Sequence, residues 1–250
     1  MKDNFSAQAT AYARYRPTYP PELYDFLYAH TPGFAFAWDC ATGNGQVARV
    51  LADAFDHVEA TDISAAQINN APPTHQNIRY RVAPAENSGL PDACCDLITV
   101  GQAAHWFDRP AFYTEANRCL KPGGLLALFG YGLFSADPET DALVYYLYED
   151  ILGTYWDPER RYVEEGYASF EFPFADIPFP PVFMETTWTV EDVLGFLESW
   201  SALQHFIRRN GYSPIDEVFR EKLAACWAVD EVKKIRFPLF GKVGKRINTP

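Results

Sequence analysis

Short apolar segments of strand length alternate with helical patterns five times between residues 34 and 130 of this 250-residue chain. The segments predicted as strands are 34–38, 57–61, 77–82, 95–100 and 125–130. This alternation favours an α/β fold with a mostly parallel sheet and helices on both faces. A doubly wound sheet binds ligands at the carboxyl ends of its strands. We therefore expect a site where the first strand ends.

A glycine-bearing turn follows that strand, in the segment "DCATGNGQVA" (39–48). Gly43 to Ala48 match the dinucleotide pattern G-x-G-x-x-A, and Asp62 follows at the distance of the acid in that pattern. Asp39 argues against a dinucleotide, because a pyrophosphate here would face a carboxylate at a cost on the order of several kcal/mol. S-adenosylmethionine (SAM) avoids this repulsion, since its sulfonium and amino groups are positive.

Other residues near the predicted strand ends fit the same ligand. Gly43 and Gly45 let the backbone approach the methionine moiety closely. Asp62 can accept both ribose hydroxyls, and Ala85 and Glu86 follow the third strand, where an adenine would lie. Each acid also has a structural alternative: Asp39 as a helix cap or loop acid, and Asp62 as the negative charge at the start of the next helix.

The chain resembles the class I SAM-dependent methyltransferases, type 11 group, in four successive segments: "WDCATGNGQVA", "VEATDIS", "DLITVGQAAHWFD" and "RCLKPGGLLAL". It is also similar to trans-aconitate methyltransferase-like proteins in "YARYRPTYP", "HWFD", "YWDPERRYVEEGY" and "SWSAL". The resemblance covers nearly the whole chain and implies a Rossmann-like fold and transfer of a methyl group. It departs from the family at Ala41, where glycine is usual. By this resemblance SAM contacts Asp39, Ala41, Gly43, Gly45, Asp62, Ile63, Ala85, Glu86 and Gln102.

Two residues after the fourth strand are candidates for contact with the methyl acceptor. His105 can act as a base or as a donor that orients an acceptor oxygen, and its alternative is a structural histidine. Trp106 can form a pocket wall or belong to the core. An acceptor that is a carboxylate needs no base, because it is already ionised.

Arginines in two other segments can recognise acidic groups. In "AYARYRPTYP" (11–20), Arg14 is predicted to pair with the SAM carboxylate, and Tyr15 and Arg16 to contact the acceptor. In "DPERRY" (157–162), Arg161 is predicted to neutralise an acidic acceptor. The alternatives are a solvated arm for the first segment and salt bridges to nearby glutamates for the second.

The predicted organisation is one methyltransferase domain over residues 1–250. Within it we expect an N-terminal lid over 1–30, a SAM-binding half over 31–130, an inserted aromatic-rich cap over 131–181, and completion of the sheet by 182–250. Helices are expected over 139–152, 191–211 and 214–228, and strands over 182–190 and 233–247. Pro238 in the last strand suggests an edge or a bend.

Net charge and composition limit the classes of partner that the chain can bind. A net charge of −12 argues against nucleic acid and anionic membranes, and no segment has the apolar length of a membrane helix. Five cysteines without a C-x-x-C pattern indicate reduced thiols and a cytoplasmic protein, and the five histidines lack metal-ligand spacing.

Three functions stay open at this point. A SAM-dependent methyltransferase acting on a small molecule, with a carboxylate as one candidate acceptor, is the first. A non-catalytic SAM-binding or regulatory protein is the second, and Ala41 supports it. An NAD(P)-dependent oxidoreductase is the third, and it rests on the literal glycine pattern. The sequence leaves the acceptor and the oligomeric state open.

Overall fold

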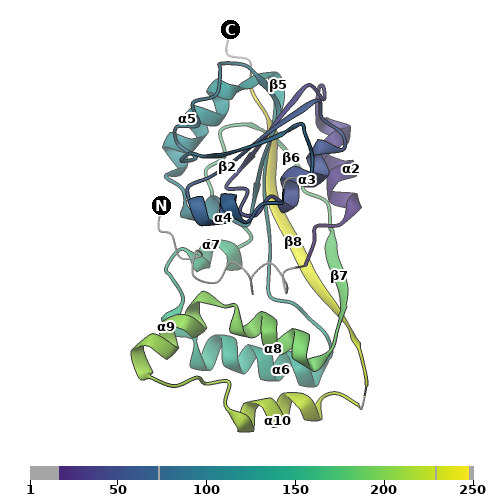
Figure 1. Cartoon of the computed structure of the whole chain (residues 1–250), viewed down its shortest axis with the longest axis vertical. Helices are drawn as coiled ribbons and strands as arrows, with labels where there is room; N and C mark the ends of the chain where they lie inside the picture. Colours follow the sequence, from purple (N-terminus) through teal and green to yellow (C-terminus); the bar gives the residue numbers. More distant parts are fainter. Residues whose placement is uncertain (1–16, 73, 229, 248–250) are drawn as a thin grey trace.

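The computed structural model describes residues 17–72, 74–228 and 230–247, and it centres on a twisted sheet (Figure 1). Within the described residues the sheet has the order β3-β2-β1-β4-β5-β8-β6, and β7 pairs with β8 outside this path. The strands are β1 (Phe36–Cys40), β2 (His57–Asp62), β3 (Ile78–Val82), β4 (Cys95–Gly101), β5 (Leu120–Tyr131), β6 (Ala175–Ile177), β7 (Phe183–Trp188) and β8 (Lys233–Lys245).

Strands β1 to β5 pair in parallel, while β6, β7 and β5 each pair antiparallel with β8. The order reverses direction between β1 and β4, which is the switch point of a doubly wound sheet. The predicted Rossmann-like, mostly parallel fold is therefore confirmed, with all five predicted strands of its first half present.

Alternate residues of the central strands face opposite layers, as a period of two requires. Ala37 packs in one core with the buried faces of α2 and α3, and Trp38 packs in a second core with α5. Trp38 is fully buried, and its indole N–H donates to Thr61 Oγ1 at 2.9 Å, so this ring leaves no unpaired donor in the core. The helices of the sheet layers are α2 (Pro21–His30), α3 (Gln46–Ala52), α4 (Ala65–Asn69) and α5 (Arg109–Cys119).

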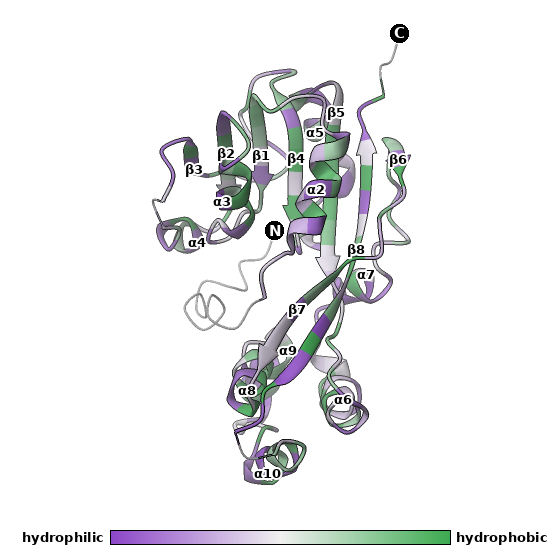
Figure 2. Ribbon diagram, turned by 90° about the vertical axis from the view of Figure 1, so that its right-hand side faces the viewer, coloured by the Kyte–Doolittle hydropathy of each residue, from purple (hydrophilic) through white to green (hydrophobic). Residues whose placement is uncertain are grey.

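A helical lobe extends from one end of the sheet, and a long two-stranded ribbon of β7 and the first half of β8 leads into it (Figure 2). We define this lobe as residues 138–155 together with 190–225. It contains α6 (Pro138–Tyr145), a π-helical turn (Tyr146–Ile151), a short 3₁₀ turn (Gly153–Tyr155), α8 (Val190–Glu198), α9 (Ser201–Asn210) and α10 (Glu217–Ala225). One continuous core runs from the sheet into the lobe, so the two parts fold together.

The lobe draws on both of the segments that the sequence prediction assigned separately, to a cap over 131–181 and to sheet completion over 182–250. Of these later residues, the described strands that join the main sheet are β8 and β6, and β6 belongs to the predicted cap. At the other end of the chain, the α2 part of the predicted lid is a helix packed on the sheet, with Leu23 and Leu27 fully buried.

Pro238 lies where β8 changes partners. It stands opposite Phe183 of β7, and from Leu239 onward β8 pairs with β5. Proline has no N–H to donate, so it fits this junction, while its carbonyl accepts from the Gly132 N–H at 3.0 Å.

One local prediction was wrong. The helix expected over 191–211 is broken into α8 and α9, because Trp200 adopts an extended backbone (φ −71°, ψ 133°). Its ring packs against Tyr148, Trp156 and Phe196, and this packing outweighs helix propensity. The "KPGG" segment lies within β5, which starts at Leu120 directly after α5 ends at Cys119. Gly211 closes α9 with φ 80°, as expected.

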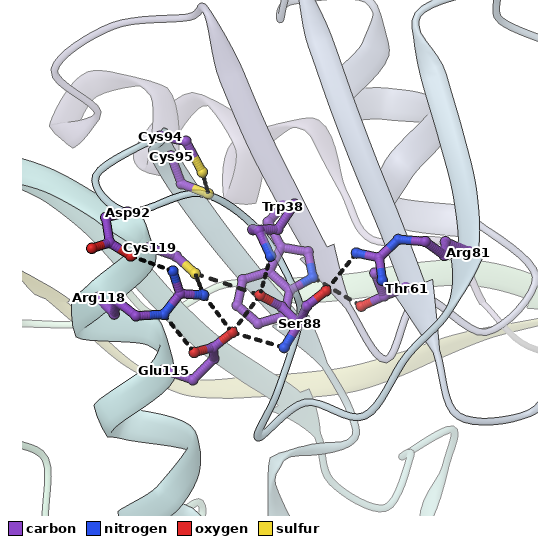
Figure 3. Close-up of polar contacts among 11 residues, drawn as sticks. Trp38, Thr61, Arg81, Ser88, Asp92, Cys94, Cys95, Glu115, Arg118 and Cys119 are labelled. Atoms are coloured by element: carbon purple, nitrogen blue, oxygen red, sulfur yellow. Dashed lines mark hydrogen bonds and ion pairs between the residues drawn. The ribbon is translucent and has the colours of Figure 1, made fainter.

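A buried polar network anchors the loop after β3 to α5 (Figure 3). Glu115 Oε1 accepts from the Ser88 N–H at 2.7 Å, and Arg118 Nε donates to the other oxygen of Glu115 at 2.9 Å. Arg81 donates to Glu59 Oε1 at 2.8 Å and also to the Ser88 carbonyl. This network fixes the position of residues 85–88, where the sequence placed the adenine contacts.

The five cysteines carry free thiols, in agreement with the expected reduced state. Among the described residues, no helix combines the length and the apolar character that crossing a membrane requires.

Candidate active site

Two adjoining cavities open at the carboxyl ends of the parallel strands. The first, which we call the turn cavity, is lined by residues that follow β1, β4 and β5, among them Asp39, Ala41, Gly43, Gly101, Gln102 and Tyr131. The second, the aromatic cavity, lies between the sheet and the helical lobe and is lined by, among others, Trp106, Trp156, Asp157, Arg160, Phe196 and Trp200. The turn cavity lies where the sequence predicted the site.

Gln102 and Tyr131 belong to both cavities and form the wall between them. The Gln102 side chain is fixed on the backbone of Tyr131: its Oε1 accepts from the Tyr131 N–H at 2.8 Å, and its Nε2 donates to the Tyr131 carbonyl at 3.2 Å. Gln102 also has φ 53°, a left-handed conformation that is strained for any residue except glycine. The wall is therefore rigid, and its strain is of the kind found at functional sites.

Asp39 is a buried carboxylate on the turn cavity. Its Oδ1 accepts from Thr99 Oγ1 at 2.8 Å, and its Oδ2 accepts from Thr42 Oγ1 and from the Ala48 N–H, the latter at 3.0 Å. Asp39 therefore caps α3, which was the structural alternative for it, and it also lines the cavity. Burial raises its pKa from 3.8 to about 6, against the lowering effect of these three donors.

The glycine turn needs its two glycines for different reasons. Gly43 (φ 57°) lines the turn cavity, and the nearest atom to a Cβ placed on it is Gln67 Oε1 at 4.0 Å, so the space above it is open. Gly45 (φ 82°) faces Tyr80, whose hydroxyl oxygen would lie 2.3 Å from an added Cβ. Gly43 thus exposes backbone to a ligand, and Gly45 permits close packing of the turn on β3.

Ala41, the departure from the family pattern, has φ 55°. This left-handed conformation costs an L-residue roughly 1–2 kcal/mol, and glycine escapes it. We expect Ala41→Gly to raise the free energy of unfolding by about 1 kcal/mol, measured by urea denaturation. The control is Ala37→Gly, within β1, which should lower the free energy of unfolding. A loss of stability in Ala41→Gly would instead show that the alanine methyl group stabilises the turn by packing.

Asp62 braces the glycine turn from the end of β2. Its Oδ2 accepts from the Gly43 N–H at 2.9 Å, and its Oδ1 accepts from the Ser64 N–H at 2.8 Å. Asp62, Ile63, Ala85 and Glu86 lie beyond the residues that line the turn cavity, and Glu86 Oε1 accepts from the Asp108 N–H at 3.1 Å. Their contact with SAM stays a prediction.

His105 lies on the aromatic cavity and is buried. Its Nδ1 is 3.2 Å from the hydroxyl of Tyr167, which is fully buried. Burial, and secondarily the positive charge of Arg160, lower the pKa of His105 from 6.5 to about 3. The imidazole is therefore neutral at physiological pH and can donate or accept a hydrogen bond, but it is a weak base.

The prediction for Arg161 is corrected by the structure. Arg161 is exposed and donates to the Tyr162 hydroxyl at 2.9 Å, whereas its neighbour Arg160 lines the aromatic cavity. Both belong to α7 (Arg160–Glu164), and successive residues of a helix point about 100° apart. The sequence pair indicated the right segment but not which of the two arginines faces inward. Trp106, as predicted, forms part of the cavity wall.

Arg14, Tyr15 and Arg16 lie outside the described residues, so the predictions for them stay predictions. The sequence did not indicate Tyr19 and Tyr131 as lining residues of the turn cavity, nor Asp157, Phe196 and Trp200 of the aromatic cavity. "YWDPERR" and "SWSAL" contain two of these residues, Asp157 and Trp200, and were singled out only by resemblance. No spacing rule connects them, because they come from four different segments.

The turn cavity suits a ligand whose nearby groups are neutral or positive. It has a buried carboxylate and exposed turn backbone, and no lysine or arginine of the described residues lines it. A pyrophosphate would lack a counter-charge there, which disfavours the dinucleotide alternative, whereas the sulfonium and amino groups of SAM fit. No cluster of metal-ligating side chains occurs in the part of the chain that the structure describes.

Comparisons with known proteins agree with this geometry. A family model described as a methyltransferase domain matches residues 38–128. A protein from Dictyostelium discoideum, named as a methyltransferase, is 34% identical over 98% of this chain and 95% of its own length. A solved structure from Anaeromyxobacter dehalogenans, described as a type II methyltransferase, has a TM-score of 0.86 and 38% identity, covering 94% of this chain and 99% of that one.

More distant relatives match in part. A methyltransferase from Aspergillus candidus is 33% identical over 47% of this chain and 40% of its own length. The two matches that cover nearly the whole chain include the lobe. The chain belongs to the class I SAM-dependent methyltransferases of the type 11 group, and its cofactor is SAM.

Proposed function

We propose that this methyltransferase acts on a small-molecule acceptor that carries a carboxylate or another anionic oxygen group. The observation that carries the proposal is the shared wall of Gln102 and Tyr131 between a cavity suited to SAM and a cavity that contains Arg160. The aromatic cavity is lined by side chains of the sheet and the lobe, so it suits a compact molecule better than a polymer.

We assign the SAM methionine moiety to the turn cavity, between Asp39 and the backbone at Ala41 and Gly43. Bound SAM supplies a methyl group on a sulfonium; the S–CH₃ bond breaks with its electron pair left on sulfur as an acceptor lone pair forms the new bond. Gln102 and Tyr131 hold the two cavities in register, which is the positioning that an in-line displacement requires. A carboxylate acceptor becomes a neutral ester, so no proton has to leave.

His105 is proposed as a positioning donor to the acceptor. A base with a pKa of about 3 takes up a proton poorly at neutral pH, but a neutral imidazole can hold an acceptor oxygen in place. The contact with the Tyr167 hydroxyl fixes the ring orientation. An ionised carboxylate held by Arg160 has no proton to lose, so it needs a positioning donor and no stronger base.

The test is formation of S-adenosylhomocysteine (SAH) from SAM with a panel of small carboxylic acids, trans-aconitate included, each paired with its amide. We expect turnover with at least one acid and none with the matching amide, and loss of that activity in Arg160→Gln with SAM affinity kept. Arg161→Gln is the matched control and should retain activity. Tight SAM binding without turnover of any acid would contradict the anionic acceptor, and absence of SAM binding would favour a non-catalytic protein.

The role of His105 predicts a flat pH profile. At saturating SAM, kcat should change less than about twofold between pH 5.5 and 8, because the imidazole is neutral throughout this range. His105→Ala should keep SAM affinity near that of the wild type and lower kcat by about 10-fold or more through lost positioning. An inflection of kcat between pH 6 and 7 that disappears in His105→Ala would instead identify a proton-accepting histidine.

A further inference from the structure

Asp157, which lines the aromatic cavity, has a buried carboxylate oxygen without a hydrogen-bond partner among the described residues. Asp157 Oδ2 is shielded from solvent, and no hydrogen bond to it exists among the described residues. Asp157 and Arg160 line the same cavity, and the Arg160 backbone N–H donates to the Asp157 backbone carbonyl at 2.9 Å, but no ion pair between their side chains occurs in the described part of the chain. Leaving a buried acceptor unpaired is unfavourable, so an unpaired oxygen on a side chain that lines a cavity points to a ligand group that completes it.

Arg160 is held in place by aromatic neighbours. Its Nε donates to the Tyr148 hydroxyl at 2.8 Å, and its guanidinium lies 4.9 Å from the ring centroid of Trp156 and 5.4 Å from that of Tyr148. Guanidinium has five N–H donors in a planar fork, and the bond to Tyr148 uses only one of them. A cation stacked in this way keeps its remaining donors in a fixed geometry for an oxyanion.

Flat walls surround the two charged residues. Trp156 and Trp200 lie with ring centroids 5.5 Å apart and 56° between their planes, and Phe196 packs against Trp200 at 6.0 Å. Trp106 contributes another ring to the lining. Aromatic walls of this kind favour a planar apolar body, with polar groups only where the cavity provides partners.

We infer that Asp157 and Arg160 recognise two different groups of one acceptor, which is a flat carboxylic acid that also carries a hydrogen-bond donor, either a hydroxyl or an amino group. The carboxylate engages Arg160, and the donor engages Asp157 Oδ2. This inference rests on the proposed function and narrows its acceptor class. Asp157 is then a specificity-determining residue of the methyl transfer site.

The inference predicts an affinity order that can be measured without turnover. The protein is first saturated with SAH and then titrated calorimetrically with benzoate, 4-hydroxybenzoate and 4-aminobenzoate, and with the three corresponding cinnamates. These acids differ only in the hydrogen-bond donor and in its distance from the carboxylate. We expect at least one substituted acid to bind about tenfold or more tightly than its unsubstituted parent. The hydroxyl and amino arms of the panel distinguish the two donors.

Asp157→Asn should remove most of that preference by weakening only the substituted acid, because the amide replaces one acceptor oxygen by a donor. Glu159→Gln is the matched control, since Glu159 Oε2 is also buried and unpaired among the described residues but Glu159 does not line the cavity. It should leave both affinities unchanged. Equal binding of parent and substituted acids by the wild type, equal weakening of both in Asp157→Asn, or no binding of any of the six acids would overturn the inference.

Two further measurements distinguish a failure of this inference from a failure of the proposed function. SAH binding is measured first, and its absence would contradict the proposed function itself, whereas SAH binding without the acid preference contradicts only the role of Asp157. In the ligand-free protein, Asp157→Asn should not lower the melting temperature, since no hydrogen bond to Oδ2 exists among the described residues for the fold to lose. A lower melting temperature would indicate that Asp157 serves the fold, and it would overturn the assignment to ligand recognition.

Discussion

Gly45→Ala is expected to destabilise the protein by about 2–5 kcal/mol, the largest effect of any methyl-sized change in the glycine turn. Two terms add. A left-handed backbone at φ 82° costs alanine roughly 1–2 kcal/mol. The new methyl group would also lie 2.3 Å from the Tyr80 hydroxyl and 2.8 Å from Cε1 of the same ring, and overpacking of this kind costs about 1–3 kcal/mol.

Gly43→Ala is the matched comparison, because it shares the positive φ but has open space where the methyl group goes. It should cost only about 1–2 kcal/mol of stability. It should weaken SAM binding by about 10-fold or more, since Gly43 lines the turn cavity and its methyl group would occupy the place of the ligand. Urea denaturation and calorimetric titration measure the two effects. Equal stability losses in the two variants would show that Tyr80 moves aside without strain.

Asp39→Asn is expected to remove a pH dependence of SAM binding. In the free protein the pKa of Asp39 is about 6, so at pH 5 most molecules carry a neutral carboxyl group that does not attract the positive groups of SAM. Wild-type affinity should therefore fall about tenfold from pH 7 to pH 5, which is the factor expected when a ligand binds only the ionised form. The variant should bind SAM more weakly at pH 7, by about 10-fold or more, and show no such fall.

The raised pKa of Asp39 also determines whether its ionisation stabilises or destabilises the folded protein. A carboxyl group whose pKa is higher in the folded protein than in the unfolded chain favours folding when it is protonated, and this contribution is lost as pH rises from about 4 through 6. Ionised Asp39 thus costs the free protein on the order of 3 kcal/mol at pH 7. Asp39→Asn should not destabilise the ligand-free protein at pH 7 by more than about 1 kcal/mol, because the amide oxygen can still accept from the Ala48 N–H. Strong destabilisation together with unchanged SAM affinity would assign Asp39 to capping α3 alone.

Local sequence patterns predicted those features of the fold and site that depend on residues close together in the chain. The strands from β1 to β5 follow from apolar runs bounded by turns, and the turn cavity follows from the glycines beside Asp39 and from Gln102 at the end of β4. These residues meet because parallel strands all end at one edge of the sheet. Such a site can be predicted once the strands are known.

The aromatic cavity could not be predicted in the same way. Its residues come from the segment after β4, from the end of β5, from α7 and the segment before it, and from α8 and its junction with α9. They meet because the β7–β8 ribbon places the lobe at one end of the sheet. The break at Trp200 arises from ring packing between these segments, and helix periodicity carries no sign of it. The choice of Arg160 over Arg161 likewise depends on which face of a short helix turns inward.

The most direct test of the account is a crystal structure of the protein with SAH. We predict that the methionine end of SAH lies in the turn cavity, with its amino group or sulfur near Asp39 and the backbone of Ala41 and Gly43. The sulfur should face the wall of Gln102 and Tyr131, toward His105 and the aromatic cavity. SAH bound with its sulfur directed away from that wall, or bound outside the turn cavity, would contradict the assignment of the two cavities to donor and acceptor.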